Sequence, residues 1–240
     1  MQDVRLVVGS LVYTDTFTPP TAPLTAITNT QLLLNMADAQ AIDSAAQNNL
    51  QLTDDVKLST AKAKFGDTSM LFDGSGRAYI EGSNVVDFGA GDFTVEMFVN
   101  VTAFSSSYPT LLDGRNSNDV EGPIFTLFLN DDDKFAYFVD NSTRITAGSA
   151  ASADTWYHVA VCRSGTSTKL FIDGTQAGST YSDSTVYTQP NDRVILGGYY
   201  DSADYDFNGY IDEVRISKMA HYTDDFTAPT APFADKGQEE

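Results

Sequence analysis

Several residue types are scarce in this chain of 240 residues. It contains one cysteine, Cys162, and two histidines, His158 and His221. A single thiol excludes an intrachain disulfide and a cysteine-based zinc site, and two imidazoles are too few for a multi-histidine metal centre. No apolar run approaches the roughly 18 residues of a membrane helix. The first residues lack the basic-then-apolar profile of a signal peptide, so we expect neither membrane insertion nor a leader.

Basic residues are also scarce: 14 Lys and Arg stand against 33 Asp and Glu, for a net charge of −19. No Lys/Arg cluster interrupts this excess, so we expect no nucleic-acid partner. Only six of the 33 acids are Glu and the other 27 are Asp. Since Glu suits helices and Asp suits turns, this division predicts many turns and few helices. The 42% of hydrophobic residues is enough for a sizeable core.

Alternating and hairpin patterns agree with a β protein. Phe93–Val99 alternates so that Phe93, Val95, Met97 and Val99 share one face of a strand. Two hairpins are predicted, from 124–129 and 135–139 across 130–134, and from 156–163 and 169–172 across 164–168. Asp173-Gly174 then supplies a tight turn. Strands separated by such turns indicate a two-sheet antiparallel sandwich or jelly roll.

One segment leaves two interpretations open. Residues 31–50 carry five alanines, and Leu32, Met36 and Ala39 have helical spacing. The alternative is a short strand, Leu32–Met36, followed by a loop, and we favour the strand.

One segment near the start of the sequence is repeated near its end. Residues 13–23 read YTDTFTPPTAP and residues 222–232 read YTDDFTAPTAP, with nine of eleven positions identical. We therefore predict an N-terminal arm at 1–23, a β domain at 24–220, and a C-terminal arm with an acidic tail at 221–240. The Thr/Pro-rich arms read either as stiff extended linkers or as arms packed on the domain edge.

Five motifs in order resemble the laminin G-like, concanavalin A-like jelly-roll family. They are Phe72-Asp73-Gly74, Gly91-Asp92-Phe93-Thr94-Val95-Glu96, Trp156-Tyr157-His158-Val159-Ala160, Leu170-Phe171-Ile172-Asp173-Gly174 and Gly209-Tyr210-Ile211-Asp212-Glu213-Val214-Arg215-Ile216. The resemblance spans about residues 32–216 and implies an all-β, two-sheet jelly roll with extended terminal arms.

The C-terminal repeat resembles the ending of laminin G-like modules in tailed-phage virion proteins. This resemblance implies a non-enzymatic structural module on the virion surface, on capsid or tail, acting in decoration or adhesion. Its partners would be other virion proteins, or copies of itself through the terminal arms. The alternative is a lectin module that recognises host-surface glycans, with or without calcium, and a third reading is a polysaccharide hydrolase that lost its acids.

No catalytic residues are predicted. The E-x-D-x-x-E and E-x-D-x-E patterns of hydrolases with this architecture are absent, and Asp212 and Glu213 are adjacent, so they should point to opposite faces of a strand. No G-x-S-x-G elbow or phosphate-binding glycine loop occurs. We expect His158 to be a hydrogen-bonded structural residue rather than a general base, and Cys162 to be a small, partly buried hydrophobe.

The segment 201–209 suggests a ligand site. It contains D-x-D-x-N-G, hard oxygen ligands at alternate positions, but the EF-hand Glu is missing because Arg215 stands there. The family resemblance implies a nonhelical calcium site, with the turn Asp131–Asp133 as a second choice; a solvated acidic loop is the alternative. The candidate ligands are Asp204, Asp206, Asn208 and Asp212.

Three tyrosines, Tyr199, Tyr200 and Tyr205, accompany this loop. Aromatic faces stack on sugars and carboxylates accept hydrogen bonds from hydroxyls, so these tyrosines are candidate carbohydrate-binding residues. They would serve equally as contacts to a neighbouring subunit, where Tyr is favoured.

Overall fold

The computed structural model divides the chain into two compact units, Met1–Gln40 and Ala41–Glu240. The residues that it describes are 4–7, 12–13, 16–18, 30–34, 49–81, 85–104, 108–115, 125–188, 193–199 and 203–233. In the first unit, β1 (Val4–Val7) pairs antiparallel with β2 (Thr30–Leu34). The strand predicted near Leu32 is therefore present, whereas residues 35–48 lie outside the described part.

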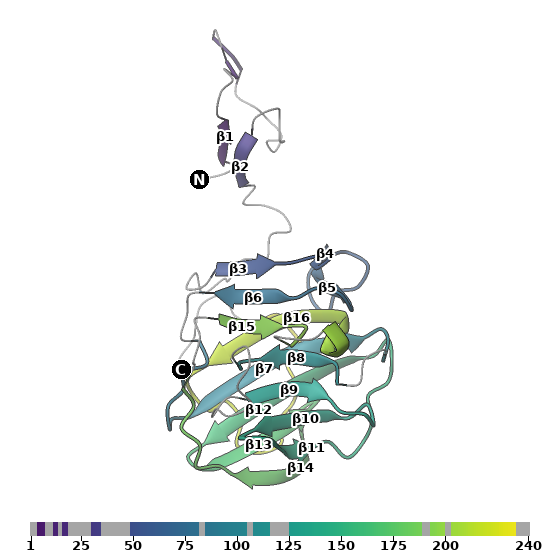
Figure 1. Ribbon diagram of the computed structural model, residues 1–240, viewed down its shortest axis with the longest axis vertical. Coiled ribbons are helices and arrows are strands. Elements are labelled where there is room, and N and C mark those ends of the chain that lie inside the picture. Colours follow the sequence, from purple (N-terminus) through teal and green to yellow (C-terminus); the bar gives the residue numbers. More distant parts are fainter. Residues whose placement is uncertain are drawn as a thin grey trace. The chain divides into compact units, whose positions relative to one another are not determined.

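The second unit consists of two antiparallel sheets of seven strands each (Figure 1). Sheet I has the order β11 (Ser142–Thr146), β10 (Phe135–Val139), β9 (Phe125–Leu129), β8 (Thr110–Asp113), β15 (Arg193–Leu196), β6 (Ala78–Glu81), β3 (Asn49–Leu52). Sheet II has the order β14 (Thr175–Ser182), β13 (Ser167–Ile172), β12 (Trp156–Ser164), β7 (Phe93–Val101), β16 (Asn208–Ser217), β5 (Ser69–Asp73), β4 (Lys57–Ser59). A short 3₁₀ helix, η1 (Ala203–Tyr205), precedes β16. This arrangement confirms the all-β jelly-roll sandwich.

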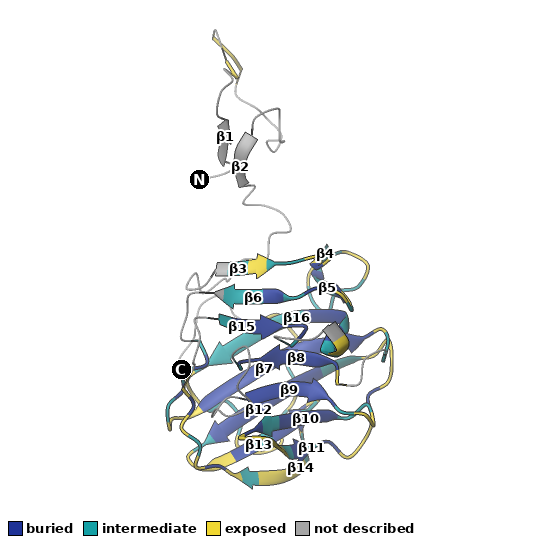
Figure 2. Ribbon diagram, viewed as in Figure 1, coloured by how far each residue is buried: buried dark blue, intermediate teal, exposed yellow. Residues whose placement is uncertain are grey.

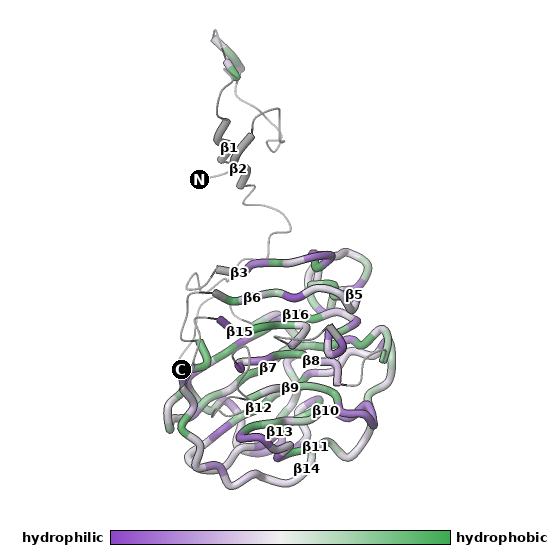
Figure 3. The backbone as a smooth tube through the Cα atoms, in the orientation of Figure 1, coloured by the Kyte–Doolittle hydropathy of each residue, from purple (hydrophilic) through white to green (hydrophobic). Residues whose placement is uncertain are grey.

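Alternating side chains of the central strands form the core between the sheets. Phe93, Val95, Met97 and Val99 of β7 are all fully buried in it, as the alternation predicted. Figure 2 shows burial concentrated on the middle strands, and Figure 3 shows apolar residues along the same strands. Because both faces of β7 are buried, its outward residues must also be covered, which the site below explains.

Both predicted hairpins form. β9 and β10 pair across Asn130–Lys134 with Phe135 opposite Leu129, as expected. The loop between β12 and β13 is shorter than predicted, because Ser164 pairs with Ser167 and leaves only Gly165 and Thr166 in the turn. Asp173 and Gly174 connect β13 to β14 with φ of 50° and 81°, the positive values of a type I′ turn.

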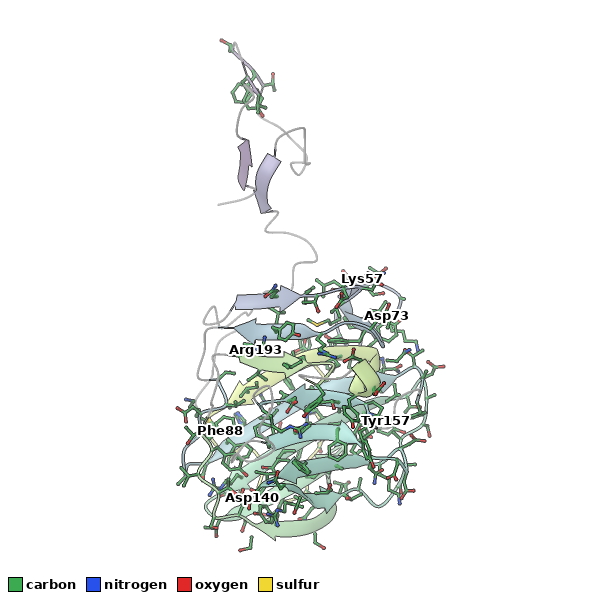
Figure 4. The ribbon with its side chains drawn as sticks, viewed as in Figure 1. Lys57, Asp73, Phe88, Asp140, Tyr157 and Arg193 are labelled. Carbon is green, nitrogen blue, oxygen red and sulfur yellow. The ribbon has the colours of Figure 1, made fainter. Side chains whose placement is uncertain are left out.

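A buried aromatic and polar cluster stabilises one end of the core. Phe88, labelled in Figure 4, stacks on Phe93 with ring centroids 4.4 Å apart. The Tyr187 hydroxyl donates to Asp183 Oδ2 at 2.6 Å, and Thr168 Oγ1 donates to the same oxygen at 2.7 Å. Burial alone would raise the pKa of Asp183, but these hydrogen bonds lower it overall, so its buried carboxylate stays ionised.

A β-bulge interrupts the last strand. Asp212 is opposite Phe98 of β7 but Arg215 is opposite Glu96, so one extra residue is inserted between them, and Glu213 has φ +52°. The bulge places Asp212 and Arg215 on the same side of sheet II in spite of their odd spacing. The strict alternation of side chains that was expected at Asp212 and Glu213 is therefore interrupted by the bulge.

Candidate functional site

The outer face of sheet I carries a group of aromatic side chains that we call the aromatic platform. Its members are Tyr108, Phe128, Tyr199 and Tyr205. Tyr199 follows β15, Tyr205 ends η1, Tyr108 lies just before β8 and Phe128 lies in β9, so four separate segments supply it. Ring centroids are 5.3 Å apart for Tyr199 and Tyr205 and 6.0 Å for Tyr108 and Tyr205.

An ion pair between the partly exposed Arg115 and the buried Asp113 adjoins the aromatic platform. The guanidinium carbon of Arg115 lies 4.5 Å from the centre of the Tyr199 ring, and Arg115 Nε donates to Asp113 Oδ1 at 2.8 Å. Thr126 Oγ1 donates to the same carboxylate oxygen at 2.9 Å. These contacts hold Arg115 against one face of Tyr199 by a cation–π interaction.

The structure brings together two of the three predicted sugar-binding tyrosines. Tyr199 and Tyr205 are half-buried and in edge-to-face contact, whereas Tyr200 lies outside the described residues. Tyr108 is 39% exposed and completes the group. Neither Tyr108 nor Arg115 was predicted, because both are far from residues 199–205 in the sequence. The pairing of β8 with β15 brings these segments together.

The four predicted calcium ligands make separate contacts. Asp206 is buried and accepts from Arg77 Nε at 2.7 Å, while Asp204 is exposed on η1. Asn208 Nδ2 donates to the carbonyl of Asp73, and Asp212 accepts from the backbone amides of residues 64 and 65. Burial outweighs these contacts and raises the pKa of both Asp206 and Asp212.

Within the described part of the chain, no three His, Cys, Asp or Glu side chains gather closely enough to hold a metal ion. At the second candidate turn, Lys134 pairs with Asp132 at 3.3 Å and the Asn130 side chain accepts from two turn amides. Calcium binding stays a prediction from the sequence.

Sheet II is covered on its outer face by the C-terminal segment 218–233, which we call the strap. Tyr222 and Phe226 of the strap stack on each other and pack against Ala160, Cys162 and Phe171. The amide of Phe226 donates to the carbonyl of Gly174 at 2.8 Å, and Asp225 accepts from the amide of residue 176 at the same distance. The C-terminal arm is thus a packed arm over this stretch.

A buried acid–base cluster lies beneath the strap. Glu96 Oε2 accepts from His158 Nε2 and from the Tyr222 hydroxyl, each at 3.0 Å, and Glu96 Oε1 accepts from Arg215 Nε at 2.7 Å. Glu96 and His158 are both fully buried, and the hydrogen bond requires the His158 proton on Nε2. His158 Nδ1 has no hydrogen-bond partner in the described structure, so the bond to Glu96 is the one that orients the ring.

The strap therefore separates this cluster from solvent, and His158 is a hydrogen-bonded structural residue, as expected. Cys162 is buried, with Thr94 Oγ1 3.2 Å from its sulfur, and burial raises the pKa of its thiol. Glu96 was not predicted as a partner. Its signal in the sequence is the single charged residue of a nine-residue strand, at an outward position.

None of the helical segments in the described part of the chain has the length and hydropathy of a membrane span. No curated protein matches the chain in sequence. Solved structures share its fold at low identity. The binding domain of Paraclostridial Mosquitocidal Protein 1 matches with a TM-score of 0.58 and 14% identity, over 74% of this chain and 45% of that one.

Two further solved structures come from carbohydrate-active proteins. Domain 4 of AbnA, a GH43 extracellular arabinanase from Geobacillus stearothermophilus, in complex with arabinotriose, matches at TM-score 0.50 and 14% identity, covering 71% of this chain and 82% of that domain. Trypanosoma rangeli sialidase matches at TM-score 0.53 and 16% identity, over 70% of this chain and 28% of the sialidase. Apart from the AbnA domain, this chain spans less than half the length of these structures.

One family model covers most of the β sandwich, from the end of β5 to the middle of the strap. It matches residues 73–224 and describes the concanavalin A-like lectin/glucanase superfamily, in its laminin G-like form. The match contains the alternating strand β7, the two hairpins and the closing strand that carried the resemblance in sequence. The chain belongs to this laminin G-like family of the concanavalin A-like lectin/glucanase superfamily.

Proposed function

We propose that this chain is a non-enzymatic carbohydrate-binding module that takes glycans on the aromatic platform. The observation that carries the proposal is the gathering of Tyr108, Tyr199 and Tyr205 beside Arg115 on the outer face of sheet I. Tyrosine offers a sugar an apolar ring face and a hydroxyl, and Arg115 adds a charged donor at the edge of the platform, held there by the buried Asp113. The fold that it shares with the arabinotriose-bound AbnA domain supports this reading.

The acid–base cluster supports a non-catalytic role. Glu96 and His158 would be the natural proton-transfer pair, yet both are fully buried and Tyr222 closes the route to them. A general base must reach the proton that it abstracts. We expect no release of reducing sugar from any polysaccharide that the chain binds.

A glycan array with the full chain tests binding, and single variants test the site. Tyr205→Ala and Tyr199→Ala should each weaken binding about tenfold or more, the equivalent of about 1.4 kcal/mol for one lost stacking partner. Val186→Ala is the control, because Val186 is an exposed apolar side chain (54%) of the same unit that belongs neither to the aromatic platform nor to the strap. Unchanged affinity in both platform variants, or no glycan bound by the wild type, would remove the proposal.

A second candidate role is a structural or adhesion module of a phage virion. The observation that favours it is the repeated arm, because a segment present at both ends of one domain suits connection to neighbouring modules or to copies of the same chain. In this role the module lies on the surface of capsid or tail and presents the aromatic platform to host-surface glycans. Cryo-electron microscopy of particles decides it, since density for the sandwich must be found on the particle.

Calcium enters the proposal from the sequence alone. A cation bound only by the folded chain raises its melting temperature by mass action. Calcium-dependent glycan binding would then appear as a Tm that rises with CaCl2 but not with equal MgCl2, and that falls with chelator. An unchanged Tm in all three conditions would remove calcium from the proposal.

A further inference from the structure

Both copies of the repeated segment contain a stacked Tyr–Phe pair of the same ring geometry. Tyr222 and Phe226 stack with ring centroids 3.6 Å apart and planes 4° apart, and Tyr13 and Phe17 stack at 3.7 Å and 8°. The C-terminal pair is partly buried against sheet II, whereas Tyr13 and Phe17 are 44% and 49% exposed. The N-terminal copy therefore presents a preformed aromatic pair with its apolar faces in solvent.

Most strap contacts do not depend on the two positions at which the copies differ. The Tyr222 hydroxyl bonds to Glu96, Lys169 Nζ donates to the carbonyl of Thr223 and lies 3.5 Å from Asp224, and the Phe226 amide bonds to Gly174. The corresponding residues of the N-terminal copy are Tyr13, Thr14, Asp15 and Phe17, the same four residue types.

The two differences also fit the face. Asp225 becomes Thr16, whose hydroxyl oxygen is still able to accept from the amide of residue 176. Ala228 becomes Pro19, which lacks an amide hydrogen; within the described chain, the Ala228 amide is not among the donors of the strap. The N-terminal copy therefore retains a group for each of the strap contacts described above.

The outer face of sheet II beneath the strap is complementary to an aromatic pair. Ala160, Cys162 and Phe171 form a small apolar cluster, and the His158 ring lies edge-on to Phe226 with centroids 5.7 Å apart. Glu96 needs the Tyr222 hydroxyl as one of its donors. Gly174 is fitted to the strap, since a Cβ there would lie 2.0 Å from the Phe226 carbonyl oxygen.

We propose that the N-terminal Tyr13–Phe17 segment is a second strap, and that its partner is sheet II of a second copy of this chain. It docks where Tyr222–Phe226 of that copy otherwise lies, and it thereby links one copy to the next. This link deepens the assembly role proposed above by naming the site and the partner.

The link is in competition with the chain's own strap. Tyr222–Phe226 is tethered next to its face and has a high effective concentration there, whereas the segment from a second copy arrives by diffusion. Exchange is therefore favoured at high chain concentration or when the resident strap is weakened. Because an arm of one copy meets a sheet of another, the contact is heterologous: it closes a ring where the arms dock reciprocally and otherwise extends into open chains.

Sedimentation velocity of full-length variants tests the link. Tyr222→Ala with Phe226→Ala vacates the face, and we expect concentration-dependent oligomers. Adding Tyr13→Ala and Phe17→Ala should leave monomers at every concentration. A peptide of residues 12–24 should dissolve the oligomers, and the same peptide with alanine at 13 and 17 should not. Oligomers that persist without Tyr13 and Phe17, or no oligomers at all in the folded double variant, would overturn the proposal.

Circular dichroism shows whether the double variant is folded. If it is not, a less disruptive pair of substitutions takes its place. Tyr222→Phe with Asp225→Ala removes three strap hydrogen bonds but leaves both rings in place. We expect this variant to associate and to lose its association when Tyr13→Ala and Phe17→Ala are added. A variant that stays monomeric at all concentrations refutes the link. Glycan affinity is measured on the same samples, so that a failed link is distinguished from a failed platform, and cryo-electron microscopy judges the virion role separately.

Discussion

Glu96 is an ionised side chain at the centre of sheet II with no contact with water. Burial by itself would raise its pKa, but the hydrogen bond from His158 and the charge of Arg215 outweigh burial and hold the pKa below its ordinary value of 4.5. Arg215 in turn lies over the Phe233 ring, 4.2 Å from its centre. One carboxylate thus joins β7, β12, β16 and the strap.

Replacing this carboxylate should cost stability. Glu96→Gln keeps the shape of the side chain but presents an amide group to donors from Arg215, His158 and Tyr222, so at least one buried donor loses its acceptor. We expect a loss of about 1–3 kcal/mol in the free energy of unfolding, the usual cost of leaving such a group unsatisfied. Urea unfolding measures it.

Asp132→Asn is the matched control, since it makes the same chemical change on a side chain that is 69% exposed. It should change the free energy of unfolding by no more than about 0.5 kcal/mol. Equal losses in the two variants would mean that the cluster under the strap contributes nothing specific.

The lowered pKa of Glu96 also predicts a pH dependence. Because the folded pKa is depressed, the contribution of Glu96 is present above its unfolded pKa, near 4.5, and is lost as pH falls through the folded value. The raised pKa values of Asp206 and Asp212 act in the opposite direction, since protonation favours their buried state. The difference in unfolding free energy between wild type and Glu96→Gln isolates the first effect.

This difference should be constant from about pH 5 to 7 and should shrink below about pH 4.5. Urea titrations at half-unit pH intervals measure it. A difference that grows on acidification would show that Glu96 is protonated in the folded chain.

The strap is the element whose docking depends most on one backbone position. Gly174 has φ +81° and its backbone touches the Phe226 carbonyl, so an alanine there meets both an unfavourable conformation and a clash. Gly165, in the neighbouring hairpin turn, has φ +58° and open space where a Cβ would lie. Both glycines have a positive φ, but only Gly174 has the clash.

Gly174→Ala should therefore destabilise the chain by more than about 1 kcal/mol, and by more than Gly165→Ala, which has only the conformational cost. Hydrogen exchange should show faster exchange in strap residues 222–228 for Gly174→Ala and unchanged exchange there for Gly165→Ala. Similar strap exchange in both variants would contradict the close packing of Gly174 against Phe226.

The elements that could be predicted are those specified by local pattern. The alternation of Phe93–Val99 and the Asp173-Gly174 turn each follow from a few consecutive residues, and both are confirmed. The bulge at Glu213 was not predictable, because it is fixed by the pairing of Arg215 with Glu96 on another strand. Only part of the aromatic platform could be predicted. Tyr199 and Tyr205 lie six positions apart in the sequence, but Tyr108 and Arg115 come close to them only through the pairing of strands in sheet I.

At the scale of the whole molecule, the aromatic platform and the strap lie on the outer faces of different sheets. Tyr108, Tyr199 and Tyr205 lie over sheet I, and Tyr222 and Phe226 cover sheet II. A glycan and a second copy of the chain therefore do not compete for one surface. Linked copies would present several platforms at once, and such multivalency increases the avidity of a weak sugar site.

The net charge of −19 acts on every copy and on the fold itself. Many acids lie at exposed turns, among them Asp132 and Asp154, and few cations are available to balance them. Like charges confined to one compact molecule repel, and this repulsion destabilises the folded state. Buried pairs such as Arg163 with Asp183 respond little to salt, because screening acts mainly on exposed charges.

Salt should therefore stabilise this protein. Raising NaCl from about 0.01 M to 0.15 M shortens the screening length from about 30 Å to about 8 Å, less than the span of a domain, so long-range repulsion fades while buried pairs persist. We expect Tm to rise by roughly 2–4 °C, the equivalent of about 1 kcal/mol for a chain of this size. Differential scanning calorimetry measures it, with KCl at the same ionic strength as the control for specific ion effects. A Tm that falls with both salts would mean that exposed ion pairs, such as Lys62 with Asp154, outweigh the excess of negative charge.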